Sequence, residues 1–451
     1  MKKLLCAVSA AALALVATTP ASAEICTIDD VPAATLLLPY FEVDLGNTTG
    51  VNTLFSINNA SASAAVAHVT VWTDQSIPTL DFDVYLTGYD VQTISMRDIF
   101  SGNLPVTADD GADPADTISN QGDFSQDINF PGSSGPCVQA YTNPVLDNFR
   151  VTNLRAAHTG ENAPAYGGCL GANYDDNIAR GYVTVDSVTQ CNLLFPSSAT
   201  YFSGGIADTR NILWGDYFYI NGGQNFAQGE TLVHVESCVP GNGYVGFVGN
   251  GAGWCPFAPG DYTFYGRYAA VAGQDQREPL ATTFATRFVN GGAFDGGTDL
   301  IVWRDSKTIP TGVNGPYTCG STTRPAWFPL NQTDVVAFDE QENPQDLCFT
   351  GDVVSPPLGG EQTCFPLEAQ RVSLQGGNAI GSDPTPEADF GWMYLNLNHT
   401  LAASAGTDPF PGFAQNWVTT VMDAEGRFSV GFDAIQLDSA CDPDNVIFAA
   451  N

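Results

Sequence analysis

The sequence is poor in positive charge. Its 451 residues contain 15 lysines and arginines against 49 aspartates and glutamates, which gives a formal net charge of −34 at pH 7. A polyanion repels the phosphates of nucleic acid and the anionic surface of membranes. We therefore expect no nucleic-acid partner. After residue 23 no stretch approaches the ~20 consecutive apolar residues of a spanning helix, so we also expect no membrane insertion.

Motifs of known catalytic and metal centres are also missing. The patterns G-x-S-x-G, H-E-x-x-H and C-x-x-C do not occur, and no cofactor fingerprint is present. The four histidines, His68, His158, His234 and His399, stand far apart in the sequence. Each is expected to make a hydrogen bond in a strand or turn rather than to bind a metal. These absences favour binding or structural roles over catalysis.

The first 23 residues have the pattern of a secretory signal peptide. Lys2 and Lys3 precede an apolar run over residues 4–16, and Ala21-Ser22-Ala23 fits the small-residue cleavage rule. We therefore expect a secreted protein of the periplasm, the cell surface or the extracellular space.

Cysteine usage agrees with an oxidising compartment. Apart from Cys6 inside the apolar run, the number of cysteines is even, which predicts five disulfides. Cys26 and Cys441 lie near the two ends of the mature chain, and we expect them to pair. The cysteines predicted to form disulfides are Cys26, Cys137, Cys169, Cys191, Cys238, Cys255, Cys319, Cys348, Cys364 and Cys441.

Short β-branched and aromatic runs separated by turn residues indicate an all-β fold. Over residues 35–105 they read "TLLLPYFEVDL", "NTLFSINNAS", "AVAHVTVWTD", "FDVYLTGYD" and "VQTISMRDIF", and similar runs resume from about residue 180. This spacing predicts an antiparallel β-sandwich. The segment resembles the immunoglobulin-like modules of uncharacterised secreted bacterial β-sandwich proteins. The resemblance implies an Ig-like fold and nothing about mechanism.

The order of the runs predicts how the chain is divided. After the signal peptide (1–23) we expect an Ig-like sandwich (24–106), an acidic loop or linker (107–136) and a larger disulfide-stapled β-rich domain (137–451) with few short helices. The spacing of apolar residues over 143–155 predicts one of these helices. Two runs around residues 423–426 read as a hairpin, with a short amphipathic helix over 413–425 as the alternative.

The acidic stretch "TADDGADPADTISNQGDFSQD", residues 107–127, raises the question of a calcium site. An EF-hand loop needs acids at positions 1, 3 and 5 and glycine at 6. Starting at either Asp109 or Asp110 fails this register. A solvated loop is therefore the favoured interpretation, and calcium remains the one cofactor left open. The residues that would bind it are Asp109, Asp110, Asp113 and Asp116.

Aromatic residues alternate with aliphatic ones in "FGWMYLNLNH", residues 390–399. In a strand, Met393, Leu395 and Leu397 would share one face, and a sandwich would bury them. An aromatic and amide row facing outward suits stacking on sugar rings. "WGDYFYIN", residues 214–221, alternates in the same way. Large aromatic side chains are usually at least half buried, so burial of these faces between packed sheets or domains is the favoured interpretation for both stretches, and ligand binding is the alternative. The predicted ligand-binding residues are Trp392, Tyr394, Asn396 and Asn398.

Three functions follow from these patterns. The favoured one is a disulfide-stabilised binding or structural protein outside the cytoplasm, with a carbohydrate or protein partner. The second is a secreted polysaccharide hydrolase that uses paired carboxylates, which 49 acidic residues can neither support nor exclude. The third is a subunit of a surface layer or fibre that self-associates through edge strands.

Overall fold

The computed structural model describes residues 31–105 and 146–438, with gaps at 193, 239–256, 258, 321–323, 349–362 and 402. The signal peptide, the acidic stretch 107–127 and four of the ten cysteines therefore lie outside the described residues. Within them the predicted all-β antiparallel architecture is confirmed, because every pair of named strands is antiparallel. No helix in this part of the chain is long and apolar enough to span a membrane.

The first half of the molecule is built from two sheets. The first outer sheet has the order β5–β2–β8–β9, with β7 also paired to β2: β2 Asn52–Asn59, β5 Val91–Ser95, β7 Leu213–Trp214, β8 Asp216–Asn221 and β9 Phe226–Thr231. The first inner sheet has the order β10–β1–β6–β3–β4: β1 Thr35–Asp44, β3 Ala65–Trp72, β4 Pro78–Leu86, β6 Ile178–Val188 and β10 Val233–Val235.

The second half repeats the pairing of an inner and an outer sheet. The second inner sheet has the order β15–β12–β17–β18: β12 Gly297–Arg304, β15 Ala369–Ser373, β17 Asn416–Asp423 and β18 Ser429–Asp433. The second outer sheet has the order β14–β13–β16–β11–β19: β11 Thr283–Val289, β13 Asp334–Asp339, β14 Pro344–Asp346, β16 Phe390–Asn396 and β19 Ile435–Gln436.

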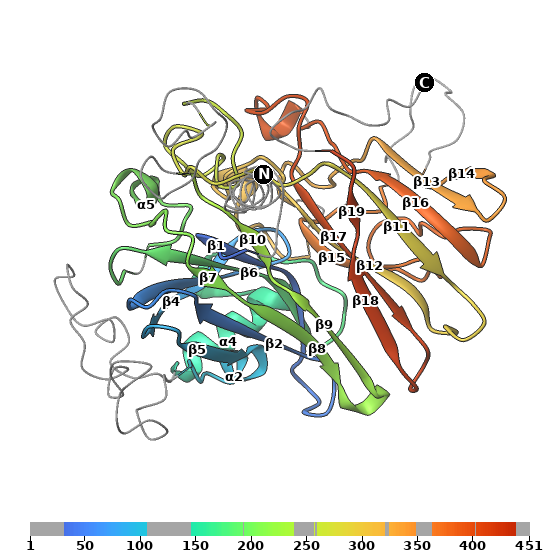
Figure 1. The fold of residues 1–451 in the computed structure, drawn as a ribbon, viewed down its shortest axis with the longest axis horizontal. Helices are drawn as coiled ribbons and strands as arrows, with labels where there is room; N and C mark the ends of the chain where they lie inside the picture. The colour runs from blue at the N-terminus through green and yellow to red at the C-terminus, as the bar shows by residue number, and fades with distance from the viewer. Residues whose placement is uncertain are drawn as a thin grey trace, which may run out of the picture.

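The two inner sheets pack against each other and are buried on both faces. β1 contacts β2 on one side and β12 on the other, while β17 and β12 contact β11. Accordingly every residue of β3 is buried, as is nearly every residue of β6 and β17, whereas β8 alternates between buried and exposed positions. In Figure 1 the blue and green strands of the first sandwich lie on the left and the orange and red strands of the second on the right.

The strand pairing crosses the predicted division of the chain. β6, at residues 178–188, lies between β1 and β3 in the first inner sheet, and β8 pairs with β2 in the first outer sheet. The five strands of residues 35–95 therefore do not form a closed sandwich of their own. The first half of the four-layer body uses strands from both predicted β segments, 24–106 and 137–451, whereas every named strand of the second half comes from 137–451.

Helices are few and short, as expected. The predicted helix over 143–155 is found as α4, Asn148–His158, which Asp147 caps by accepting a hydrogen bond from the Arg150 amide at 2.8 Å. Its buried side includes Leu154, but Phe149, which the spacing placed on the same side, is exposed. The other helices among the described residues are α2 Met96–Phe100, α5 Ala199–Ser203 and the 3-10 turns η3 Pro164–Tyr166, η4 Gly222–Gln224, η5 Gly312–Asn314 and η6 Ala403–Ala405.

The hairpin predicted around residues 423–426 is confirmed. β17 and β18 pair antiparallel from Thr419 opposite Asp433 to Asp423 opposite Ser429. Gly426 in the connecting turn has φ +71°, a conformation that glycine adopts without strain. The alternative helix is therefore wrong.

Disulfides staple the described part of the chain. Cys169 pairs with Cys319, which joins the loop after α4 to the segment between β12 and β13, and Cys348 pairs with Cys364. Cys191 and Cys238 are also disulfide-bonded. Disulfide stabilisation of the fold is thus confirmed for these cysteines. Cys26, Cys137, Cys255 and Cys441 lie outside the described residues, so the pairing of Cys26 with Cys441 stays a prediction.

Candidate functional site

The predicted ligand-binding row lies on β16 in the second outer sheet. As expected, Met393, Leu395 and Leu397 are fully buried beneath it. Trp392 is 38% exposed, and Asn396 and Asn398 are half-buried. Tyr394 differs from the expectation, because only 8% of it is exposed and burial raises the pKa of its hydroxyl. It sits in the middle of the sheet, opposite Val336 on one side and Ala285 on the other.

Trp392 is one member of a stacked aromatic pair. Its ring lies parallel to that of Phe338 on β13, with centroids 4.4 Å apart and planes 10° from parallel. Neighbouring strands are about 4.7–4.9 Å apart. The two rings therefore face each other across the gap between the strands and stand on edge above the sheet. Phe338 covers one face of the indole and holds its orientation.

The other side of Trp392 adjoins Arg287 on β11, which is directly opposite it in the sheet. Arg287 is exposed, and within the described residues no hydrogen bond or ion pair engages its guanidinium. Most other basic side chains in the described part of the chain form ion pairs or hydrogen bonds. Arg371, for example, pairs with Glu42 and Asp299. An unpaired guanidinium beside an exposed indole is thus available to a ligand.

Polar groups continue this surface along the strands. Asn396 is hydrogen-bonded to Tyr394, and the charges of Asp334 and Asp438 act on the same hydroxyl. Asp334 lies directly opposite Asn396. We call this surface the Trp392 face, defined by the outward side chains of three strands: Asp334, Val336 and Phe338 of β13; Phe390, Trp392, Tyr394 and Asn396 of β16; Thr283, Ala285 and Arg287 of β11.

The second alternating stretch, residues 214–221, lies on the first outer sheet. Tyr217 and Tyr219 point inward and are buried, whereas Trp214 and Phe218 are each 43% exposed. The ring of Phe218 occupies the space in which a side chain of residue 229 would stand, because that residue is glycine. We call the exposed side chains of this stretch the Trp214 face: Trp214, Asp216, Phe218 and Ile220. The favoured expectation, burial of both faces between packed sheets or domains, is therefore wrong for this stretch.

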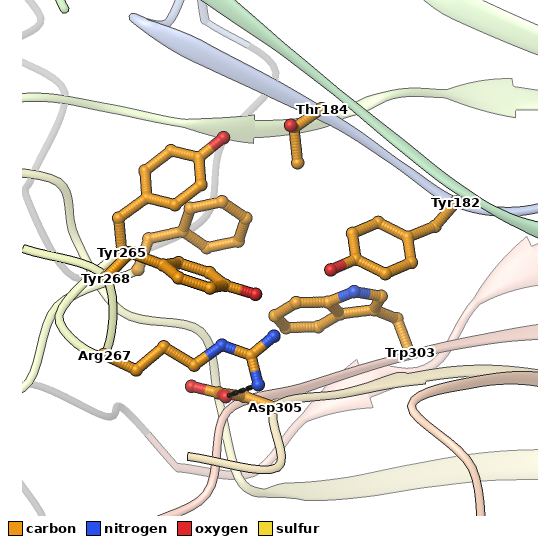
Figure 2. Close-up of a pocket in the computed structure, with 8 residues that line it drawn as sticks. Tyr182, Thr184, Tyr265, Arg267, Tyr268, Trp303 and Asp305 are labelled. Atoms are coloured by element: carbon orange, nitrogen blue, oxygen red, sulfur yellow. Dashed lines mark ion pairs between the residues drawn. The ribbon is translucent and has the colours of Figure 1, made fainter. Parts of the chain in front are cut away.

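A small cavity lies where the two inner sheets meet (Figure 2). It is lined by residues of β6, of β12 and the position directly after it, and of the segment between β10 and β11: Tyr182, Thr184, Phe264, Tyr265, Arg267, Tyr268, Trp303 and Asp305. Arg267 Nη1 lies 2.9 Å from Asp305 Oδ1 and 2.5 Å from Glu368 Oε1, and its guanidinium lies over the Tyr268 ring. All three charged side chains are almost completely buried. A cluster of charged groups is thus buried among the aromatic rings of this junction.

A second buried charge network adjoins the cavity. Asp186 on β6 accepts hydrogen bonds from the hydroxyls of Tyr201 at 2.9 Å and Tyr265 at 3.1 Å. Arg277 lies 3.7 Å from the same carboxylate. Burial raises the pKa of both tyrosines well above the usual value. These tyrosines are therefore protonated donors, and the arrangement satisfies a buried carboxylate rather than preparing it for proton transfer.

No metal centre is found among the described residues, since no group of three or more His, Cys, Asp or Glu side chains converges there. The histidines are hydrogen-bonded where the structure gives a partner: His68 Nδ1 to Asp83, His158 Nδ1 to the Arg180 carbonyl and His399 Nε2 to the Asp305 carbonyl. Burial lowers the pKa of His158 to about 4. The candidate calcium ligands Asp109, Asp110, Asp113 and Asp116 lie outside the described residues.

Comparison with known proteins gives no family to which this chain can be assigned, because no family model, curated sequence or solved structure matches it. The Ig-like resemblance therefore stays a prediction. The Trp392 face, the Trp214 face and the cavity between the inner sheets are the features from which a function can be inferred.

Proposed function

We propose that this protein is a secreted carbohydrate-binding protein that holds a neutral polysaccharide on the Trp392 face. One arrangement carries the proposal: an exposed indole, fixed on one side by Phe338 and flanked on the other by the unpaired guanidinium of Arg287. The disulfides Cys169–Cys319 and Cys348–Cys364 are compatible with secretion.

The chemistry of a sugar matches this combination of groups. A pyranose ring presents an apolar C–H face beside hydroxyl groups that both donate and accept hydrogen bonds. The indole supplies the apolar surface, Arg287 supplies donors, and Asp334 and Asn396 supply acceptors on the same face. Aromatic surface with a few placed polar groups is typical of small-molecule sites.

Charge favours a neutral polymer over an acidic one. The chain has a net charge of −34, and Asp334 and Asp438 both lie close to Tyr394 on this face. An acidic polysaccharide would approach against the repulsion of these charges, and Arg287 alone would have to offset it. For the same reason nucleic acid is not proposed as a partner.

The hydrolase alternative finds less support. A glycosidase needs an acid whose pKa is raised beside the sugar. Burial raises the pKa of Asp74 to about 7 and of Asp81 to about 6, but both belong to the first sandwich and neither lies on the Trp392 face. Asp275, whose pKa burial also raises, lies in the segment beside the cavity. Binding without hydrolysis is therefore the proposal.

Binding can be measured by isothermal titration calorimetry with soluble neutral polysaccharides and by pull-down on insoluble cellulose and chitin. An acidic polygalacturonate serves as the charged comparison. We expect Trp392→Ala to weaken binding at least ~10-fold, equivalent to ~1.4 kcal/mol, because it removes the stacking surface.

The matched control is Trp214→Ala, which removes a similarly exposed indole from the other outer sheet. It should leave binding unchanged. Equal binding by Trp392→Ala and the unaltered protein would contradict the proposal, as would failure of every neutral polysaccharide to bind. Concentration-dependent growth in native mass that Trp392→Ala abolishes would instead favour self-association.

A further inference from the structure

Two polar atoms that line the junction cavity lack a partner. The Tyr268 hydroxyl and the Trp303 indole nitrogen are buried, and neither has a hydrogen bond within the described residues. Tyr268 is 5% exposed and Trp303 is 3% exposed. A buried donor left unpaired costs about 1–3 kcal/mol, so two such atoms facing one cavity call for a common explanation.

Neighbouring polar groups are already engaged. The Tyr182 hydroxyl donates to Ser76 Oγ at 2.7 Å, and Arg267 is held by Asp305 and Glu368. An indole N–H can only donate, so Trp303 needs an acceptor inside the cavity. Figure 2 shows the hydroxyls of Tyr182 and Tyr268 pointing toward the space beside the Trp303 ring. No side chain oxygen there fills the role of acceptor for Trp303.

We propose that this cavity is a binding site for one water molecule, which accepts a hydrogen bond from Trp303 Nε1 and is hydrogen-bonded to Tyr268 Oη. The cavity offers about 10 Å³ to the centre of a water-sized sphere, close to the minimum of about 10–15 Å³ that one water requires. A larger ligand does not fit. The Tyr182 oxygen, which donates to Ser76, retains acceptor capacity for a third bond.

The water would belong to the contact between the two sandwiches. Tyr182 stands on β6 of the first inner sheet and Trp303 on β12 of the second, while Tyr268 comes from the segment between β10 and β11. The site thus connects both inner sheets to that segment through hydrogen bonds, in addition to the aromatic packing of Trp303 against Tyr182 and Phe264. It is independent of the Trp392 face and of any carbohydrate.

The structure provides a matched internal control. Trp72 is also fully buried and stacks on the same Tyr182 ring, but its indole nitrogen donates to Thr184 Oγ1 at 2.9 Å. The two tryptophans therefore share their surroundings and differ in whether the indole N–H already has a protein acceptor.

Nuclear magnetic resonance separates these two indoles. The chain has 7 tryptophans, so a ¹⁵N-labelled, deuterated sample gives few indole signals, and Trp303→Phe and Trp72→Phe assign the two of interest. We expect the Trp303 indole proton to show a cross-relaxation peak at the water frequency and the Trp72 indole proton to show none. A missing peak at Trp303 overturns the proposal, because the N–H would then point at the Tyr182 ring.

Tyr268→Phe tests the one artefact that could mimic this result, which is transfer relayed through the tyrosine hydroxyl. If a water is bound, the Trp303 peak persists in this variant. The change removes the Tyr268 hydroxyl and so enlarges the cavity slightly, while the indole N–H of Trp303 can still donate to the water. Loss of the peak assigns it to the hydroxyl and refutes the site. If one assignment variant does not fold, variants that replace each of the other tryptophans in turn assign its signal by elimination.

Discussion

The interior of the second sandwich and the junction between the sandwiches are both buried and both contain apolar side chains, but only the junction also holds a cluster of charged groups. The first is lined by aliphatic and aromatic residues such as Phe288, Leu300 and Leu395. The second holds Arg267, Asp305 and Glu368. Apolar burial stabilises roughly in proportion to area, whereas a buried ion pair can cost as much as it returns. The difference suggests that the core supplies stability and that the junction fixes how the two halves are oriented.

The largest expected effect comes from removing one member of the junction network. Arg267→Met leaves Asp305 and Glu368 buried without their guanidinium, so we expect the free energy of unfolding to fall by about 3–5 kcal/mol. Urea denaturation measures it. Arg427→Met, which removes an exposed pair with Asp295, is the control and should cost less than ~1 kcal/mol. If Arg267→Met left the free energy of unfolding unchanged, the two carboxylates would have to be solvated by water, and the junction would not be a dry interior.

Leu395→Ala probes the apolar side of the comparison. The side chain is fully buried in the second core, and we expect a loss of about 3 kcal/mol from the lost transfer energy and the cavity left behind. Ile435→Ala, at an exposed position of the same outer sheet, should change the free energy of unfolding by less than ~0.5 kcal/mol. Equal effects of both changes would show that this core is loosely packed.

Asp74 gives the junction a pH dependence that the apolar core lacks. Its backbone carbonyl accepts from Glu368 and Ala369, and burial raises the pKa of its carboxyl group to about 7. The folded state therefore binds a proton that the unfolded state releases near pH 4. This contribution to stability is complete below about pH 4 and is lost as the pH rises toward 7.

Asp74→Asn should remove this slope. The free energy of unfolding of the unaltered protein, measured by urea denaturation, should therefore fall between pH 4 and pH 7 by on the order of 1–3 kcal/mol more than that of the variant. His158 acts in the opposite direction, because a pKa lowered to about 4 costs stability as the pH falls below its usual value near 6.5. Parallel pH profiles for the two proteins would show that Asp74 is not a source of the dependence.

The smallest effects are expected on the two outer faces. Trp392→Ala and Trp214→Ala remove partly exposed rings, so each should lower the free energy of unfolding by about 1 kcal/mol or less. Thermal unfolding measured by circular dichroism checks this. A loss comparable to that of Leu395→Ala at either position would indicate that the ring is needed for folding, and it would remove that position from binding experiments.

Local patterns in the sequence predicted local structure correctly at several positions. The alternation in residues 390–399 placed Met393, Leu395 and Leu397 correctly, because side chains of a strand alternate between faces whatever its neighbours are. The same pattern could not predict that Tyr394 is buried. Its burial depends on the neighbouring strands β13 and β11, which are distant from it in the sequence. The turn at Gly426 was likewise readable from adjacent residues.

Long-range partners could not be read in this way. Arg267 and Glu368 are 101 residues apart, and Phe338 and Trp392 come from strands that no turn connects directly. The residues next to Phe338 in the sequence contain no pattern that predicts its stacking on Trp392. The helical spacing over residues 143–155 predicted that Phe149 would be buried with Leu154, but Phe149 is exposed. The positions of apolar residues along α4 do not determine which side of the helix packs against the sheet.

The position of β6 between β1 and β3 has a consequence for the order of events during folding. Leu36 pairs with Val185, and Val69 pairs with that same residue from the other side. The central strand of this sheet is therefore synthesised more than a hundred residues after its neighbours. Until it arrives, β1 and β3 have no shared partner, and closing so long a loop is slow. The first inner sheet can therefore close only after β6 has been synthesised, long after β1 and β3.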